Sequence, residues 1–248
     1  MAGEQTALIV GAGSGLSASL ARLLAKEGFH VALAARNTDK LQALAKEIQG
    51  LALKCDATNE AQVEEAFSAT ERKWGVPDLV VYNASFRTRG PVAELVPKDV
   101  ERALAVCAFA GFLVGQAAAK RMLARASGSA APDSARQCAG AIFFTGASAS
   151  VKGYAESAPF AMGKFALRGL AQSMARELAP KNIHVAHFVI DGGIRNNAQA
   201  GGDPRAGERG ADGMLLPDEI AKNYLHVYRQ HRSAWSWELE LRPWVERF

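Results

Sequence analysis

Short apolar runs alternate with helical patterns along most of this chain, and this alternation limits the fold more than any other feature. Runs typical of strands occupy residues 6–10, 30–34, 51–55, 79–82, 141–145 and 183–189. Helical patterns stand between them at residues 14–27, 39–48, 60–74, 98–123 and 157–178, with Asp39 expected to cap the second and Pro97 to open the fourth. Because each crossover lays its helix on the sheet, the pattern predicts a doubly wound parallel α/β sheet with helices on both faces.

The end of the chain departs from this alternation. A helix is expected to begin at Pro217, and residues 235–241 alternate in polarity, which predicts a seventh strand at the sheet edge. Exposed tryptophans on such an edge, from Trp235 onward, favour coverage by a partner. We therefore expect one domain over residues 1–248, with residues 217–248 forming its C-terminal helix and edge strand.

Composition excludes several classes of protein. With 49% hydrophobic and 22% charged residues, the chain is neither disordered nor a coiled coil. The three cysteines have no C-x-x-C spacing, which argues against a disulfide scaffold and favours a reducing compartment. The net charge of +4 comes from scattered basic residues, so we expect no nucleic-acid partner. The amino terminus lacks the order of a secretory signal, and we expect a cytoplasmic protein.

One uncharged stretch, residues 103–119, has nearly the length of a membrane span. It is rich in alanine and glycine, whereas a lipid-facing helix prefers leucine, isoleucine and phenylalanine. We therefore expect no membrane partner, and a helix that packs against other helices in a homodimer or homotetramer. Residues 126–137 are expected to form a surface loop, and residues 196–213 a mobile loop on the substrate side of the sheet.

A glycine-rich turn, Gly11-Ala-Gly-Ser-Gly15, stands directly between the first strand and the first helix. Glycines at this junction let the backbone approach a pyrophosphate that rests on the N–H groups at the helix start. A turn that serves only the backbone is the alternative. The first interpretation makes Gly11, Ser14, Gly15 and Leu16 cofactor-binding residues.

Several motifs in register with this turn resemble the short-chain dehydrogenase/reductase family. Its Gly-x-x-x-Gly-x-Gly signature is matched at Gly11 and Gly15, with Ser17 in place of the third glycine. The other matches are Cys55-Asp56-Ala57 after the third strand, Tyr82-Asn83-Ala84-Ser85 where the family has Asn-Asn-Ala-Gly, and Lys164 in the active-site helix.

The resemblance implies a single-domain Rossmann fold and a nicotinamide dinucleotide as cofactor. It implies that Asp56, followed by Ala57, holds the adenine amino group, and that Asn83, followed by Ala84, braces the sheet beside the cofactor. An acidic residue at the end of the second strand would repel the 2′-phosphate of NADP. This chain has no acid there and has the guanidinium of Arg36 instead, which favours NADP over NAD. A solvated surface arginine is the alternative for Arg36.

The catalytic positions depart from the family. Its proton-donating tyrosine lies four residues before the lysine, its serine thirteen residues before that tyrosine, and its asparagine in the long helix. These positions hold Phe160, Ala147 and Cys107, so the chain resembles a divergent branch with Phe-x-x-x-Lys. Only Lys164 remains, and the resemblance implies that it also binds the nicotinamide ribose.

Other groups near these positions are candidates for substitute roles. Ser148 and Tyr154 are candidate proton donors, with a turn or capping role as the alternative for each. After the sixth strand Asp191 replaces the family's proline, whereas the backbone of Gly192 and Ile194 could still contact the carboxamide. No metal site is expected.

Two hypotheses follow. The first is an NADP-dependent oxidoreductase that transfers hydride to or from a carbonyl or alcohol of a small-molecule substrate with a non-standard proton donor. The second is an NADP-binding pseudoenzyme with a structural or sensing role.

Overall fold

A single parallel sheet forms the centre of the protein. The computed structural model describes residues 5–128, 138–196 and 203–247, and within them seven strands lie in the order β3-β2-β1-β4-β5-β6-β7. The strands are β1 Gln5–Val10, β2 Phe29–Ala35, β3 Leu51–Lys54, β4 Leu79–Tyr82, β5 Gly140–Thr145, β6 Ile183–Ile190 and β7 Glu238–Leu241. The strand order and the parallel pairing confirm the predicted doubly wound sheet, with β7 at its edge.

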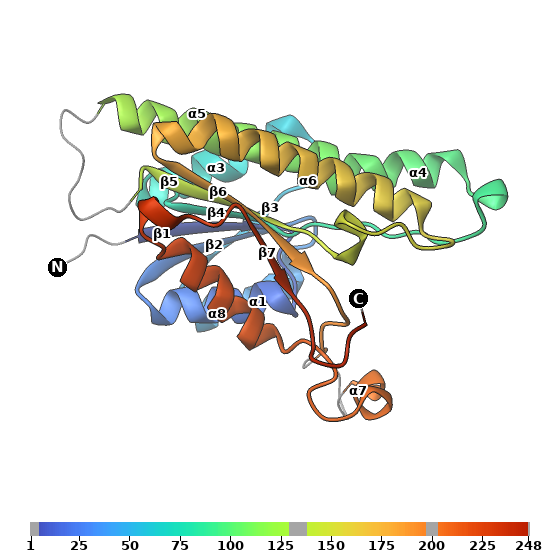
Figure 1. Cartoon of the computed structure of the whole chain (residues 1–248). Coiled ribbons are helices and arrows are strands. Elements are labelled where there is room, and N and C mark those ends of the chain that lie inside the picture. The colour runs from blue at the N-terminus through green and yellow to red at the C-terminus, as the bar shows by residue number, and fades with distance from the viewer. Residues whose placement is uncertain (1–4, 129–137, 197–202, 248) are drawn as a thin grey trace.

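Helices cover both faces of this sheet (Figure 1). They are α1 Leu16–Lys26, α2 Asp39–Glu47, α3 Glu60–Trp74, α4 Pro97–Leu104, α5 Ala110–Gly128, α6 Ala158–Leu178, α7 Pro204–Arg209 and α8 Pro217–Tyr228. One face packs against α1, α2 and α8, and the other against α3, α5 and α6.

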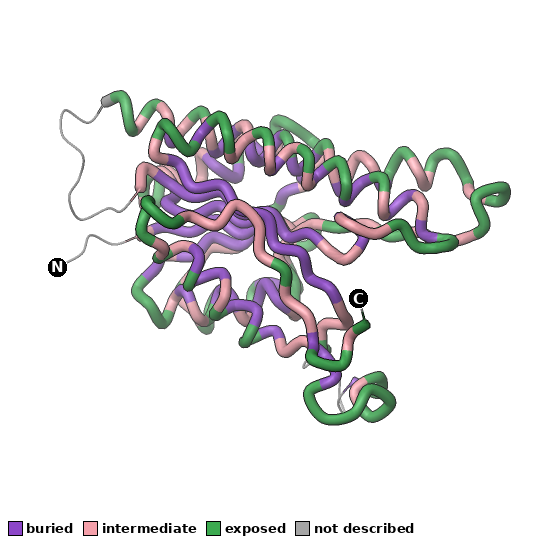
Figure 2. The backbone as a smooth tube through the Cα atoms, viewed as in Figure 1, coloured by how far each residue is buried: buried purple, intermediate pink, exposed green. Residues whose placement is uncertain are grey.

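Burial on both faces explains the unbroken apolar runs of the central strands. Along β1, Ala7 and Ile9 belong to the core under α1 and α8, whereas Leu8 and Val10 belong to the core under α3 and α5. Figure 2 shows the central strands buried, while the edge strands and the outer faces of the helices are partly or fully exposed. This is the pattern expected where helices cover both sides of a parallel sheet.

Several predicted boundaries were wrong for local reasons. The first helix begins at Leu16 instead of residue 14, because the glycine turn comes before it, and Thr38 takes the cap position expected for Asp39. The expected loop at residues 126–137 begins later, because α5 continues to Gly128. Its other residues, 129–137, lie outside the described part of the chain.

The substrate-side loop and the terminal strand also differ from expectation. Residues 204–209 of the expected mobile loop form the short helix α7, and residues 197–202 lie outside the description. The last strand covers only Glu238–Leu241. Trp235 lies before this strand. Its indole N–H donates to the Gln230 carbonyl and its ring stacks on His184. The Trp235 side chain is therefore partly buried instead of exposed.

The long helix expected at residues 98–123 is interrupted by a π-helical turn, Ala105–Phe109. The hydroxyl of Tyr82 donates to the carbonyl of Val106 in this turn. Burial raises the pKa of Tyr82, which keeps this hydroxyl protonated as a donor. The turn therefore sits directly over the end of β4, where it brings Cys107 toward α6.

Among the described residues, this helical stretch is the one that is long and apolar enough to cross a membrane. It covers residues 97–127, and half of its most apolar window is buried inside the protein. Val114, Ala117 and Ala118 pack in the core against the sheet. This stretch therefore covers the sheet as a core helix.

Candidate functional site

A cleft opens where the sheet order reverses, at the carboxyl ends of β1 and β4. Its volume is about 970 Å³. In doubly wound sheets the crossovers leave β1 and β4 on opposite sides, so a crevice forms between them and receives ligands. Seven of the predicted cofactor residues line it: Gly11, Ser14, Arg36, Asp56, Ala57, Asn83 and Ala84.

Gly11 controls how closely the end of β1 approaches the end of β4. Its φ is +83°, and a Cβ placed on it would lie 2.3 Å from the Ala84 nitrogen. Gly13, in contrast, has no atom within 4 Å of such a Cβ. The glycine at position 11 is therefore required by both conformation and space.

The start of α1 is available to an anion. Gly15 occupies its cap position without a side-chain cap bond, and the first turn carries no acidic residue. The first N–H groups of a helix have no partner within the helix, and they attract anions. Ser14, just before the cap, lines the cleft, whereas Gly15 and Leu16 do not.

Ser17, which replaces the third glycine of the motif, has a positioning role that the sequence analysis missed. Its hydroxyl accepts a hydrogen bond from the Asn83 side-chain amide at 2.7 Å and donates toward the Gly11 carbonyl at 3.5 Å. A polar side chain at a glycine position was the available signal. Ser17 thus fixes Asn83 against the glycine turn.

Positive charge gathers at the far end of the cleft. Arg36 lies there as expected, and Lys40 and Arg102, which the sequence analysis did not select, line the same cleft. Burial alone would raise the pKa of Asp56. Hydrogen bonds from Thr58 and the charges of Arg36 and Arg102 outweigh burial and hold this pKa below its usual value. Asp56 is thus an ionised hydrogen-bond acceptor beside a cationic surface.

The four predicted catalytic positions come together beside the cleft, where Val106 of its lining precedes Cys107. Phe160 and Cys107 are buried with Ala149 in one small cluster, and Ala147 packs against it. The Cys107 thiol donates to the Phe86 carbonyl, 3.2 Å away. A side chain on the nearest residue of α6, Gly163, would lie 2.6 Å from the Cys107 Cβ. The π turn and α6 are therefore in close contact.

Lys164 lies one helical turn after Phe160 and is 2% exposed. Its ammonium donates to the Thr145 carbonyl at 2.8 Å, and its Nζ lies 5.8 Å from the centre of the Phe160 ring. Burial lowers the pKa of Lys164, and the neighbouring Cys107 opposes this shift. Lys164 does not line the 970 Å³ cleft.

The candidate substitute donors differ in exposure. Ser148 begins a 3₁₀ turn, Ser148–Ser150, whereas Tyr154 is 45% exposed in the loop before α6. Within the described part of the chain, the buried hydroxyl of Ser157 has no hydrogen-bond partner, although Ser157 occupies the cap position of α6.

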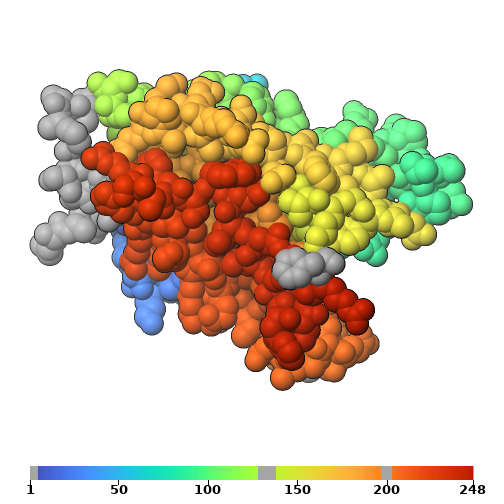
Figure 3. Space-filling model, in the orientation of Figure 1, coloured from blue at the N-terminus to red at the C-terminus, as the bar shows by residue number. Residues whose placement is uncertain are grey.

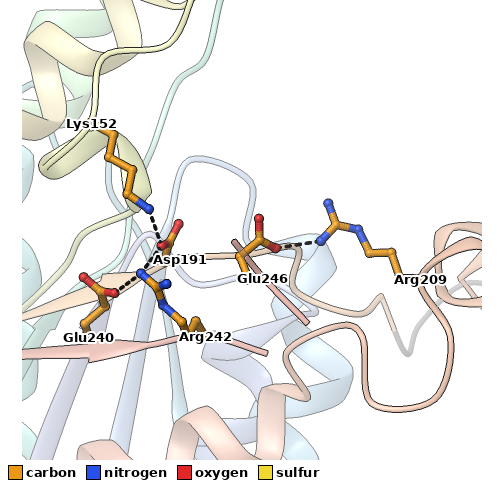
Figure 4. Close-up of polar contacts among 6 residues, drawn as sticks. All are labelled: Lys152, Asp191, Arg209, Glu240, Arg242 and Glu246. Carbon is orange, nitrogen blue, oxygen red and sulfur yellow. Dashed lines mark hydrogen bonds and ion pairs between the residues drawn. The ribbon is translucent and has the colours of Figure 1, made fainter. Parts of the chain in front are cut away.

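The end of β6 is covered by the C-terminal segment, through the ion pairs of Figure 4. Asp191 is 2% exposed and accepts from Lys152 at 2.8 Å and from Arg242 at 2.7 Å. Farther along, Arg209 pairs with Glu246 at 2.9 Å. In Figure 3 the C-terminal segment correspondingly lies between residues 204–214 and the loop before α6.

Gly192 and Ile194 lie outside the lining of the 970 Å³ cleft, and Gly192 lies under the C-terminal segment. A Cβ on Gly192 would lie 2.6 Å from Pro243. The carbonyl of Ile194 accepts from Arg205 at 3.1 Å. The described residues contain no group of three histidine, cysteine, aspartate or glutamate side chains able to hold a metal ion.

Comparison with known proteins decides the family. The family model "short chain dehydrogenase" matches residues 5–200. The chain belongs to the short-chain dehydrogenase family. A crystal structure of a short-chain dehydrogenase from Rhodopseudomonas palustris is 34% identical and covers 97% of this chain and 99% of its own, with a TM-score of 0.78.

Two further relatives agree with this assignment. A metagenomic short-chain oxidoreductase solved in complex with NADP is 25% identical, covers 96% of this chain and 97% of its own, and has a TM-score of 0.78. Carbonyl reductase family member 4 from Danio rerio is 27% identical over 80% of this chain and 79% of that protein. The protein is therefore a member of an oxidoreductase family.

Proposed function

We propose that this short-chain dehydrogenase binds NADP and transfers hydride between its nicotinamide and a carbonyl or alcohol of a small molecule. The observation that carries the proposal is the cationic end of the cleft, where Arg36, Lys40 and Arg102 line the wall. The 2′-phosphate distinguishes NADP from NAD, and it would bind to such a surface. The NADP complex of the metagenomic relative supports this choice.

The lining fits a dinucleotide. The glycine turn and the start of α1 would hold the pyrophosphate, and Asp56 would accept from the adenine amino group. Lys164 would bind the nicotinamide ribose. Lys164, Gly192 and Ile194 lie outside this lining, and the family relationship assigns the backbone of Gly192 and Ile194 to the carboxamide.

When bound, the nicotinamide supplies a hydride to a carbonyl carbon, and the carbonyl oxygen takes up one proton to give an alcohol. Phe160 has no proton to give, so we assign proton donation to Ser148 or Tyr154 in the loop before α6. Burial lowers the pKa of Lys164. Its ammonium therefore releases a proton more readily than an exposed lysine would.

Arg36→Ala tests the cofactor choice. We expect NADPH binding to weaken by about 1–3 kcal/mol, because one charge-assisted contact to the phosphate is lost. NADH binding should change little. Calorimetric titration with both cofactors measures the difference, and Arg72→Ala on the outer face of α3 is the matched control. Equal losses for NADPH and NADH would contradict the assignment.

We also propose a homodimer or homotetramer in the cytoplasm. The π turn, α5 and α6 carry the exposed apolar side chains Phe109, Phe112, Met162 and Phe165, and the rings of Phe109 and Phe112 stack on each other. A groove of about 490 Å³ runs among these helices. A continuous apolar surface of this kind is typical of an interface between subunits.

Light scattering at micromolar concentration should therefore give two or four times the chain mass. Phe109→Asp should shift the protein toward the monomer, because a carboxylate in an apolar interface is costly to desolvate. Val92→Asp, at a more exposed apolar side chain outside this groove, is the control. A monomeric wild-type protein would refute the proposal.

A further inference from the structure

The loop after β4 forms a wall in front of the catalytic cluster. Gly90 of this loop donates its N–H to the Glu156 carbonyl at 3.1 Å, which joins it to the loop before α6. Between these points Arg87 places its guanidinium carbon 5.2 Å from the centre of the Phe160 ring. The ring at the expected tyrosine position therefore has two cations beside it, Arg87 and Lys164.

Within the described part of the chain, Arg87 has no acidic partner. Among the residues that the structure describes, neither Arg87 nor Arg89 makes an ion pair or a side-chain hydrogen bond. Burial, and then the charge of Arg89, lower the pKa of Arg87. Seven other arginines pair with carboxylates, namely Arg22, Arg72, Arg121, Arg168, Arg205, Arg209 and Arg229. The positive charge of Arg87 is thus left uncompensated at this position.

A guanidinium that lies over an aromatic ring uses its flat face for the contact. Its N–H groups lie in the plane of the guanidinium, so they remain able to bind a planar or tetrahedral oxyanion with two parallel hydrogen bonds. Arg87 is an exposed residue, so these N–H groups are open to a ligand from solution.

We propose that Arg87, with Arg89 beside it, binds an oxyanion of the substrate, and that the carbonyl substrates of this protein carry a carboxylate or a phosphate. That the bound anion belongs to a substrate rests on the proposed hydride transfer. The anion site itself rests on the contacts of Arg87. Phe160 would then serve as the support of a substrate-binding arginine.

Two pairs of probes test the proposal: acetoacetate against methyl acetoacetate, and dihydroxyacetone phosphate against dihydroxyacetone. Their dissociation constants are measured by calorimetry on the whole protein saturated with NADP⁺, in which no reduction can occur. In at least one pair the anion should bind about 10- to 100-fold more tightly than its neutral partner, the range expected of a charge-assisted contact. The pair that responds tells a carboxylate from a phosphate.

Arg87→Ala and Arg87→Gln should both remove this preference. Glutamine keeps the loop covered, so loss in both variants, with unchanged thermal melting, is not a folding effect. Arg232→Ala is the matched control, because Arg232 is an exposed arginine on the turn Arg232–Ala234 at the amino end of β7. It should keep the preference.

The proposal is overturned if the anion and its neutral partner bind equally in both pairs, or if Arg87→Ala retains the preference. Oxidation of NADPH with the neutral carbonyls is followed separately. Turnover without any anion preference would leave the proposed function standing and remove the anion site. An Arg87-dependent preference without turnover on any carbonyl would support the anion site and contradict the proposed hydride transfer.

Discussion

Replacing Gly11 with valine is expected to abolish dinucleotide binding. The φ of +83° is strained for any side chain, and the new Cβ would lie 2.3 Å from the Ala84 nitrogen. The left-handed conformation alone costs roughly 1–2 kcal/mol, and relief of the overlap must push β1 and β4 apart at the cleft. NADPH titration followed by calorimetry should show no binding at millimolar cofactor, together with a lower melting temperature.

Gly13→Ala is the control for this prediction. Gly13 lies in the same turn, but a Cβ on it meets no atom within 4 Å and its φ is not positive. We expect binding within about threefold of wild type, since an exposed substitution without steric conflict changes little. If Gly11→Val bound NADPH as Gly13→Ala does, the cleft would not be the dinucleotide site.

Local patterns were sufficient to predict the sheet and the glycine turn. Periods of apolar residues mark buried strands directly, and the turn at Gly11 is a local requirement of the backbone. A helix that contains a π turn shows the same apolar content as a regular one. The interruption at residues 105–109 was therefore not visible in the sequence.

Contacts between distant residues were the other part that could not be predicted. The pairing of Asp191 with Lys152 and Arg242 depends on three segments that only the folded sheet brings together. The contact between Arg87 and Phe160 joins the loop after β4 to the first turn of α6. Charged residues in loops carry no period, so neither their partners nor their direction follows from the sequence.

Phe160→Tyr combined with Ala147→Ser is expected to create or raise carbonyl reduction. The two residues pack in one cluster, and Phe160 lies one turn before Lys164. A phenol there would supply the site with a positioned general acid, and general acids contribute roughly 10²–10⁴-fold to rates. A buried phenol without a partner would cost about 1–3 kcal/mol. The new serine and Lys164 are its expected partners.

The measurement is NADPH oxidation over a panel of carbonyl compounds that includes anionic members. Phe165→Tyr is the matched control, because it adds the same hydroxyl to an exposed ring on the same helix and should leave the rate unchanged. The informative contrary result is a double variant that folds, binds NADPH as the parent does and reduces nothing. The pocket would then not present a carbonyl to the nicotinamide, and the parent protein would bind its cofactor without turnover or use Tyr154 or Ser148 on another kind of substrate.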